Sequence, residues 1–118
     1  MASNYVNGKL DGIKVWYYPN GFVKNIQNFD NGEFHGMNYW YHENEKLKMT
    51  INFNKGIRTG KIYSYHDNGN LMIEGQYEND LEEGIWNIYD NEGKLMKTTT
   101  YINGESDYDI SDIKIDLS

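Results

Sequence analysis

Residues 61–77 read KIYSYHDNGNLMIEGQY, two segments of alternating side chains on either side of an Asp-Asn-Gly turn. In the first segment Tyr63 and Tyr65 fall on one side of an extended chain, and their neighbours fall on the other. Alternation on both sides of Asn-Gly is typical of a β-hairpin with a tight turn. The stretch therefore predicts strands at about 61–66 and 70–77.

The same pattern recurs along the chain with a period of 24 residues. Four columns share this spacing: Gly12/Gly36/Gly60/Gly84, Tyr17/Tyr41/Tyr65/Tyr89, Val23/Leu47/Leu71/Leu95 and Tyr5/Phe29/Phe53/Tyr77/Tyr101. Two more glycine columns follow the same rhythm: Gly8/Gly32/Gly56/Gly104 and Gly21/Gly69/Gly93. Of the 12 glycines, Gly75 alone lies outside these columns.

The period predicts one domain over residues 1–118, with four repeats and a partial repeat at each end. The repeats are placed at about 5–28, 29–52, 53–76 and 77–100. Strands are expected near 13–18, 22–29, 37–42, 46–53, 61–66, 70–77, 85–90 and 94–101. Consecutive strands form antiparallel hairpins, so the fold class is all-β, an elongated solenoid-like sheet of stacked hairpins.

The tyrosine, leucine and aromatic columns are expected to share one buried face of this sheet. The Gly12 column is expected to let neighbouring backbones approach closely. Glu45 and Asp80 stand where the turn columns otherwise have glycine. A looser or distorted turn is expected at Glu45, since a side chain resists positive φ.

Residues 101–118 are expected either to form a last strand that protects the open end of the sheet or to be an acidic tail. The strand interpretation depends on ISDIKIDLS, where apolar Ile113, Ile115 and Leu117 alternate with Lys114 and Asp116.

Composition and charge narrow the function classes. The chain has 118 residues and no cysteine, which excludes disulfides and thiolate metal sites. Residues 1–59 hold seven Lys/Arg against five Asp/Glu, and residues 60–118 hold four against thirteen. Such an acidic half disfavours nucleic acid and anionic lipid and is compatible with a basic protein partner. The alternative interpretation is that the acidity only keeps a tyrosine-rich protein soluble. With no apolar run of membrane length and no signal-peptide core, a cytoplasmic protein is expected.

The segments NGEFHG, GKIYSYHDNGNLMIEGQYEN and EEGIWNIYDNEGKLMKTTTYINGE resemble the MORN-repeat variant, over about residues 5–104. This is the form of the membrane occupation and recognition nexus repeat found in bacterial YwqK-type proteins described as antitoxins. The resemblance implies an elongated sheet of stacked hairpins, no catalytic residues and a function performed by contact. The antitoxin description implies a cytoplasmic protein that binds and blocks a toxic enzyme.

Enzyme and metal chemistry find little support in the residue pattern. His42 and His66 occupy equivalent repeat positions, but a metal site needs a third ligand, and solvated strand residues are the favoured interpretation. The stretch DYDISD at 107–112 lacks the central glycine and terminal glutamate of a calcium loop and is taken as acidic tail. We therefore expect no catalytic residue, no metal and no cofactor.

Two groups of residues are candidates for binding a partner. The first lies opposite the tyrosine column and is unusually aromatic for a sheet face: Trp16, Tyr18, Trp40, His42, His66 and Trp86. These side chains are either a contact surface or part of the core. The second is an acidic cluster of Glu78, Asp80, Glu82 and Glu83.

The sequence thus predicts a non-enzymatic protein-binding module. In its most specific form it is an antitoxin or immunity-type inhibitor that places these carboxylates against a basic cleft. The alternatives are a scaffold or homo-oligomerisation module, including a homodimer, and, less favoured by the charge, a lipid-binding module.

Overall fold

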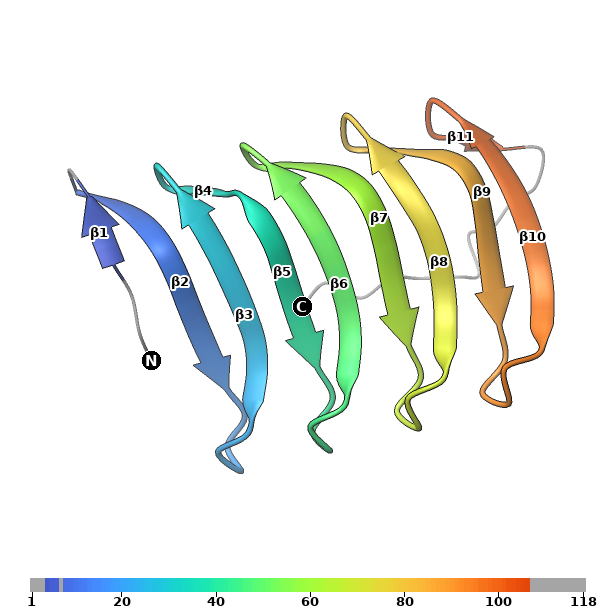
Figure 1. Cartoon of the computed structure of the whole chain (residues 1–118), viewed down its shortest axis with the longest axis horizontal. Helices are drawn as coiled ribbons and strands as arrows, with labels where there is room; N and C mark the ends of the chain where they lie inside the picture. The colour runs from blue at the N-terminus through green and yellow to red at the C-terminus, as the bar shows by residue number, and fades with distance from the viewer. Residues whose placement is uncertain (1–3, 7, 107–118) are drawn as a thin grey trace.

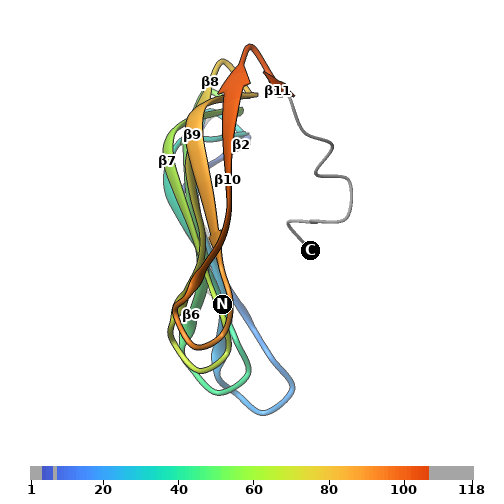
Figure 2. The same cartoon turned by 90° about the vertical axis from the view of Figure 1, so that its right-hand side faces the viewer.

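The structure is a computed structural model that describes residues 4–6 and 8–106 of the chain. These residues form one open antiparallel sheet, in which each strand follows its neighbour along the chain (Figure 1). Seen edge-on, the sheet is a single bent and twisted layer (Figure 2). The predicted all-β sheet of stacked hairpins is confirmed. The capping strand or acidic tail was predicted at residues 101–118, and of these, residues 107–118 lie outside the described residues.

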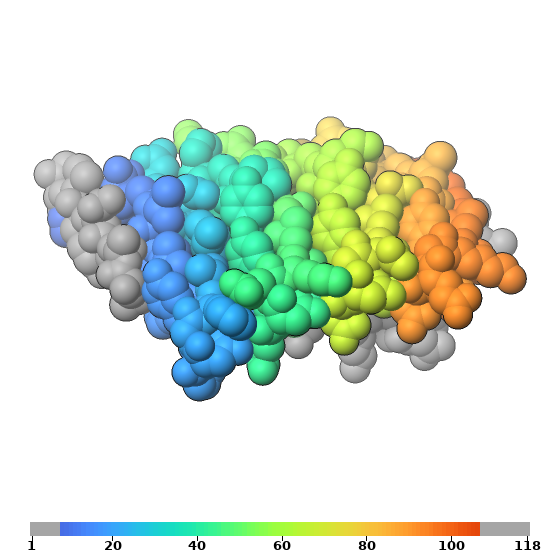
Figure 3. All heavy atoms as spheres, turned by 60° about the horizontal axis from the view of Figure 1, so that its bottom comes forward, coloured from blue at the N-terminus to red at the C-terminus, as the bar shows by residue number. Residues whose placement is uncertain are grey.

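The long strands belong to four successive hairpins. They are β2 (Lys9–Tyr17), β3 (Val23–Asp30), β5 (Gly36–Tyr41), β6 (Leu47–Asn54), β7 (Ile57–Tyr65), β8 (Leu71–Glu78), β9 (Leu81–Tyr89) and β10 (Leu95–Ile102). Three short strands complete the sheet: β1 (Asn4–Val6), β4 (Glu33–Phe34) and β11 (Glu105–Ser106). In the space-filling view the repeats lie side by side as successive bands (Figure 3).

Tight two-residue turns join the hairpins along the edge that is uppermost in Figure 1, which we call the upper rim. Both central residues of each turn have positive φ, as type I′ turns require. The pairs are Asn31–Gly32, Lys55–Gly56, Asn79–Asp80 and Asn103–Gly104. Asp80 keeps this geometry, with φ of 71°, although it replaces glycine. The aspartate therefore changes the chemistry of the rim but not its backbone.

The turn at Glu45 was expected to be distorted, and this expectation is wrong. Glu45 has a φ of 73°, in the same left-handed region as Gly69 in the next repeat. Its N–H donates to the His42 carbonyl at 3.0 Å, just as the Gly69 N–H donates to the His66 carbonyl at 2.9 Å. Neighbouring repeats hold the turn in place, so the backbone of Glu45 adopts a left-handed conformation that is unfavourable for a residue with a side chain.

Replacing Glu45 with glycine is expected to stabilise the protein by about 0.5–1 kcal/mol, because the left-handed conformation costs a residue with a Cβ more than it costs glycine. Urea unfolding of wild type and Glu45→Gly measures the difference. Glu45→Ala is the matched control, since it removes the carboxylate but keeps the Cβ. An equal gain in both variants would show that charge, rather than backbone conformation, is responsible.

A β-bulge in each repeat determines which side chains share a face. Trp40 pairs with Met49, but the adjacent Tyr41 pairs with Leu47, so the β6 strand carries one extra residue at this point. The same shift occurs in the other three hairpins. Each bulge moves the leucine column to the face opposite the Phe53 column, where alternation along the partner strand already places the tyrosine column. The prediction that all three columns share one buried face is therefore wrong for the tyrosine and leucine columns.

The buried face is the one that carries the tryptophans, and we call it the tryptophan face. Cross-strand partners form one continuous row on it: Trp16, Asn25, Trp40, Met49, Ser64, Ile73, Ile88 and Lys97. Phe53, Tyr77 and Tyr101 of the aromatic column are buried on this same face. Ile51 and Ile62, which pair with each other, are fully buried at its centre.

Gly75, the glycine outside the repeat columns, is explained by this face. A Cβ built on Gly75 would lie 2.2 Å from Cδ2 of Trp86. The Trp86 ring therefore rests directly on the Gly75 backbone, and it also packs edge-on against Tyr77 and Tyr101, at centroid distances of 5.2 and 5.7 Å. Glycine is the residue that leaves room for this ring.

The Gly12 column has a different role from the one predicted. Gly36 and Gly60 have φ of 95° and 74°, and a Cβ on either would meet its nearest neighbour only at 3.8 to 3.9 Å. Glycine is therefore required at these positions for a left-handed backbone near the start of each hairpin, rather than for the close approach of neighbouring backbone segments.

Candidate protein-binding surface

Tyr18, His42 and His66 link each repeat to the next. The Nε2 atom of His42 lies 2.9 Å from the Tyr65 carbonyl oxygen, and Nε2 of His66 lies 2.9 Å from the Tyr89 carbonyl oxygen. The Tyr18 hydroxyl donates in the same way to the Tyr41 carbonyl. These three candidate residues are therefore engaged in holding the hairpins together, a role that the solvated-strand interpretation missed.

A second ladder runs along the lower turns beside the first. The side-chain amides of Asn44 and Asn68 donate to the carbonyls of Asp67 and Asn91, at 2.7 and 2.6 Å. In both ladders each donor lies 23 residues before its acceptor, so every bond joins one repeat to the next.

The three tryptophans differ in accessibility. Trp40 is 6% exposed and Trp86 is 3% exposed, so both belong to the core and are not available to a partner. Trp16, at the equivalent position in the first hairpin, is 41% exposed. Its indole N–H donates to Gln27 Oε1 at 2.8 Å, and the Lys14 ammonium lies 4.2 Å from the ring centroid. The aromatic candidate surface is thus reduced to the first hairpin.

We call the opposite side of the sheet the tyrosine face. Its central row of cross-strand partners is Val15, Ile26, Tyr39, Thr50, Tyr63, Glu74, Asn87 and Thr98. Glu74 accepts hydrogen bonds from the Tyr89 hydroxyl at 2.6 Å and from the Asn87 amide at 3.1 Å. These two donors hold the pKa of Glu74 below its usual value, Tyr89 contributing most. A small hollow lined by Val23, Ile26, Tyr41 and Glu45 also opens on the surface.

Replacing Glu74 with glutamine is expected to cost about 0.5–1 kcal/mol at neutral pH, after allowance for solvent screening of a partly exposed carboxylate. A lowered folded pKa contributes stability above the unfolded pKa, about 4.5, that is lost as the pH falls through the folded value. The gap between wild type and Glu74→Gln should therefore narrow from pH 6 to pH 3 in urea unfolding. A gap independent of pH would show that the carboxylate charge is not involved.

The predicted acidic cluster lies at the upper rim, but its four members are not equivalent. Asp80 forms an ion pair with Arg58, its Oδ1 2.6 Å from Nε, and the Asp80 carbonyl accepts from Nη2 at 3.0 Å. This guanidinium holds the pKa of the Asp80 carboxyl below its usual value. Glu83 Oε2 accepts the Asn103 N–H at 3.0 Å. Asp80 and Glu83 therefore support the fold.

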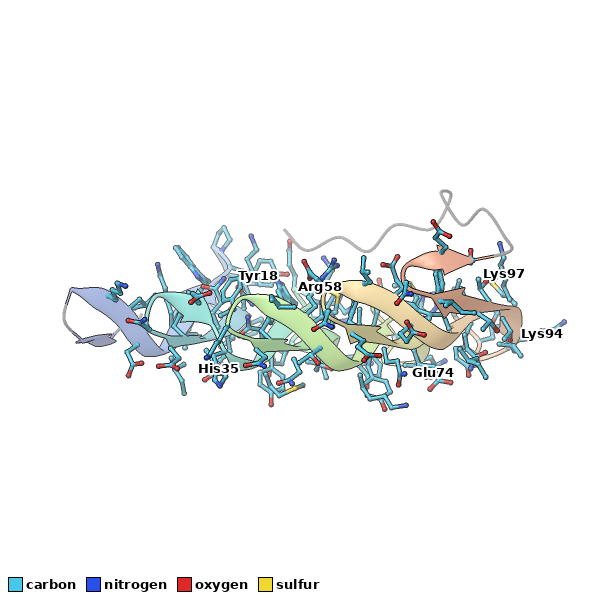
Figure 4. All side chains as sticks on the ribbon, turned by 90° about the horizontal axis from the view of Figure 1, so that it is seen from above. Tyr18, His35, Arg58, Glu74, Lys94 and Lys97 are labelled. Carbon is cyan, nitrogen blue, oxygen red and sulfur yellow. The ribbon has the colours of Figure 1, made fainter. Side chains whose placement is uncertain are left out.

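The other two carboxylates are on opposite faces of the rim. Glu78 is exposed and pairs across the strands with Leu81 on the tyrosine face. Glu82 is half-buried and pairs with Tyr77 on the tryptophan face. Figure 4 shows the two faces of the sheet: Arg58 on the tryptophan face and Glu74 on the tyrosine face project from opposite sides of the ribbon. Glu78 and Asp80 are thus the exposed members of the cluster, and Asp80 is paired with Arg58.

Three exposed apolar side chains accompany Glu78 on the upper rim, and the sequence analysis missed them. Ile57 and Leu81 are each 44% exposed, and Ile102 is 68% exposed. Ile57 and Leu81 occupy the same repeat position, so their spacing of 24 was the available signal. The rim therefore combines carboxylates with apolar side chains.

No group of three or more His, Asp and Glu side chains among the described residues is arranged to hold a metal ion. In the part of the chain that the structure describes, no helix is long and apolar enough to cross a membrane.

The MORN repeat variant matches the chain four times, at residues 10–31, 34–55, 58–79 and 82–103. The chain belongs to the MORN repeat variant family. Successive matches begin 24 residues apart, in agreement with the predicted period, and each covers one hairpin and the turn that follows it. MORN repeats are in general modules that bind proteins or membranes and are typically non-enzymatic. No curated protein matches the chain.

Proposed function

We propose that this MORN-repeat protein is a non-enzymatic module that binds a basic protein through the upper rim of its third and fourth repeats. The observation that carries the proposal is the charge of this rim. Residues 78–84 and 102–106 contain Glu78, Asp80, Glu82, Glu83 and Glu105 and no lysine or arginine. The neighbouring Arg58 is committed to Asp80. A field of one sign accelerates the encounter with a partner of opposite sign.

In the most specific form of the proposal, the partner is a toxic enzyme with a basic cleft and the protein is its antitoxin. The mechanism would be occlusion: the rim would cover the cleft, its carboxylates would neutralise the cleft's basic side chains, and the exposed apolar residues would exclude water from the contact. A cytoplasmic location is part of this proposal, and fractionation of cells that express a tagged chain tests it.

Self-association is a second candidate function, favoured by a different observation. Large apolar side chains are exposed on the first and last hairpins: Ile13, Trp16, Tyr17 and Phe22 at one end, and Ile85, Leu95 and Met96 at the other. The basic first half and acidic second half would add attraction between copies. Light scattering at low and high salt tests this candidate, since an electrostatically assisted oligomer should weaken as salt is added.

The principal test of the proposed function is capture from native cell lysate by the tagged protein, eluted with a salt gradient and identified by mass spectrometry. A single basic enzyme released at moderate salt, and inhibited by the purified chain, is the expected result. Recovery of the chain alone, or of membrane and cytoskeletal proteins, would contradict it. Liposome flotation, run in parallel, distinguishes binding to a protein from binding to a membrane, which the acidic charge disfavours.

A further inference from the structure

We propose that the hollow between the first two hairpins, on the tyrosine face near the lower turns, binds a lysine side chain of a partner protein. The walls of the hollow would hold the aliphatic stem of the lysine, and the carboxylate of Glu45 would accept its ammonium group. The hollow lies near the opposite edge of the sheet from the upper rim. This site is therefore independent of the rim contact in the proposed function.

The hollow has the size of a single side chain. Its volume is about 240 Å³, whereas sites for drug-sized ligands measure about 300–1,000 Å³. Three neighbouring elements supply its lining: Val23 and Ile26 from β3, Tyr41 from β5, and Glu45 from the turn that follows β5. All three strand residues lie on the tyrosine face, since each is paired with or next to a member of the rows described above.

The lining combines apolar surface with one charge. Val23, Ile26 and Tyr41 are half-buried, whereas Glu45 is exposed. A lysine matches both parts, because its aliphatic stem packs on apolar surface while its charged head stays near water. A hydrogen bond between an ammonium and a carboxylate is roughly twice as strong as one between neutral groups. An apolar side chain in the same place would leave the carboxylate without a partner.

The carboxylate of Glu45 is available for such a bond. In the part of the chain that the structure describes, it forms no ion pair. The adjacent Lys46 instead donates from Nζ to the Asn68 carbonyl of the next repeat, at 3.2 Å. The ammonium of Lys24 lies over the Tyr18 ring, 5.9 Å from its centroid. An incoming ammonium would therefore meet a carboxylate that is not already paired.

The backbone of Glu45 also indicates a role for its side chain. Glu45 has a φ of 73°, at a position where the other lower turns have Gly21, Gly69 and Gly93. Stability alone favours glycine in this conformation. Residues that adopt such unfavourable conformations are concentrated at functional sites, including those that hold ligands. Binding of a cation by the carboxylate would account for a glutamate here.

This combination of residues does not recur in the next two repeats. The residues equivalent to Ile26 and Glu45 are Thr50 and Gly69 in the next repeat, so both the apolar wall and the carboxylate are missing there. In the repeat after that, Glu74 stands in the place of Ile26, and its carboxylate already accepts two hydrogen bonds. The expected lysine site is therefore confined to the junction of the first two hairpins.

NMR titration of the isotope-labelled full chain tests the site. The probe is lysine blocked as its N-acetyl, N-methylamide derivative, so that the side chain carries the only charge. It is expected to shift the amide resonances of Val23, Tyr41 and Glu45 with a dissociation constant on the order of 1 mM. Norleucine blocked in the same way has the same stem without the ammonium, and it should bind at least about fivefold more weakly.

Variants of the turn separate the carboxylate from other effects. Glu45→Gln removes the charge and nearly keeps the shape, and it should weaken binding of the blocked lysine at least about fivefold. Glu43→Gln is the matched control, because Glu43 is exposed in the same turn but does not line the hollow, and it should leave binding unchanged. Glu45→Gly should lose binding while it gains stability, so that the loss cannot be attributed to unfolding.

Equal binding of blocked lysine and blocked norleucine, unchanged binding by Glu45→Gln, or no saturable shift with blocked lysine would overturn the proposal. Titration with n-butylammonium separates a protein side chain from a free amine, since it has the same stem and charge without a peptide backbone. Binding of n-butylammonium without binding of blocked lysine would also overturn the proposal, because the occupant would then be a free amine. Capture of a basic protein by the upper rim does not depend on any of these results.

Discussion

Replacing Gly75 with alanine is expected to destabilise the protein by about 3 kcal/mol, a large effect for the addition of one methyl group. The new Cβ would lie 2.2 to 2.6 Å from three atoms of the Trp86 ring. Favourable contact requires about 3.5 Å or more, so the ring would have to move by over about 1 Å. It has little freedom to do so, because Tyr77 and Tyr101 pack edge-on against it.

Urea unfolding of Gly75→Ala, Trp86→Leu and the double variant measures this contact. Leucine in place of Trp86 removes the atoms that the alanine methyl would strike. The double variant should therefore lose at least about 1 kcal/mol less than the sum of the two single variants. Strictly additive losses would show that Gly75 is required for some reason other than the Trp86 ring.

Replacing Trp40 with alanine is expected to cost about 3–5 kcal/mol, whereas the same change at Trp16 should cost only about 1 kcal/mol. The two residues lie at equivalent repeat positions, 24 residues apart, and in the same cross-strand row. Trp40 is 6% exposed, between strands on both sides, and its loss would leave a cavity. Trp16 is 41% exposed and would lose mainly the bond to Gln27 and the Lys14 contact.

Denaturant unfolding of the two variants is a matched comparison, because residue type, repeat position and substitution are the same. The difference between them arises only from position in the stack of hairpins, where inner repeats have two neighbours and the first has fewer. Similar losses in Trp16→Ala and Trp40→Ala would contradict the assignment of the tryptophan face as the core.

The repeat period and the hairpins could be predicted from sequence because they depend on local chemistry. Asn-Gly turns with alternating flanks predicted strands at 61–66 and 70–77, and the structure has β7 at Ile57–Tyr65 and β8 at Leu71–Glu78. β7 begins earlier than predicted because it continues through Gly60, whose left-handed backbone bends the strand without ending it.

The assignment of faces could not be predicted because it depends on pairing between strands. Leu47 and Phe53 have the same parity in sequence, and strict alternation places them together. The bulge beside Tyr41 separates them, and no residue type in the segment marks it. Gly75 posed the same difficulty, since the ring that requires it comes from β9.

The candidate site was predicted in part. Charge counting found the acidic cluster, and the structure places Glu78 in an exposed position on the rim. Composition could not show that Asp80 and Glu83 are held by Arg58 and the Asn103 N–H, since these partners lie about 20 residues away in sequence. The histidine ladder was likewise hidden, because its acceptors are backbone carbonyls of the next repeat.

Capture of the basic partner by two charge-reversal variants tests the central claim most directly. Glu78→Lys/Glu105→Lys changes the upper rim, and Asp67→Lys/Glu92→Lys changes net charge equally at exposed turns on the opposite edge. All four side chains are exposed, so both variants should fold. We expect the upper-rim variant to capture at least about tenfold less of the partner than the variant with substitutions at the opposite edge. Full capture by the upper-rim variant, or equal loss in both, would contradict it.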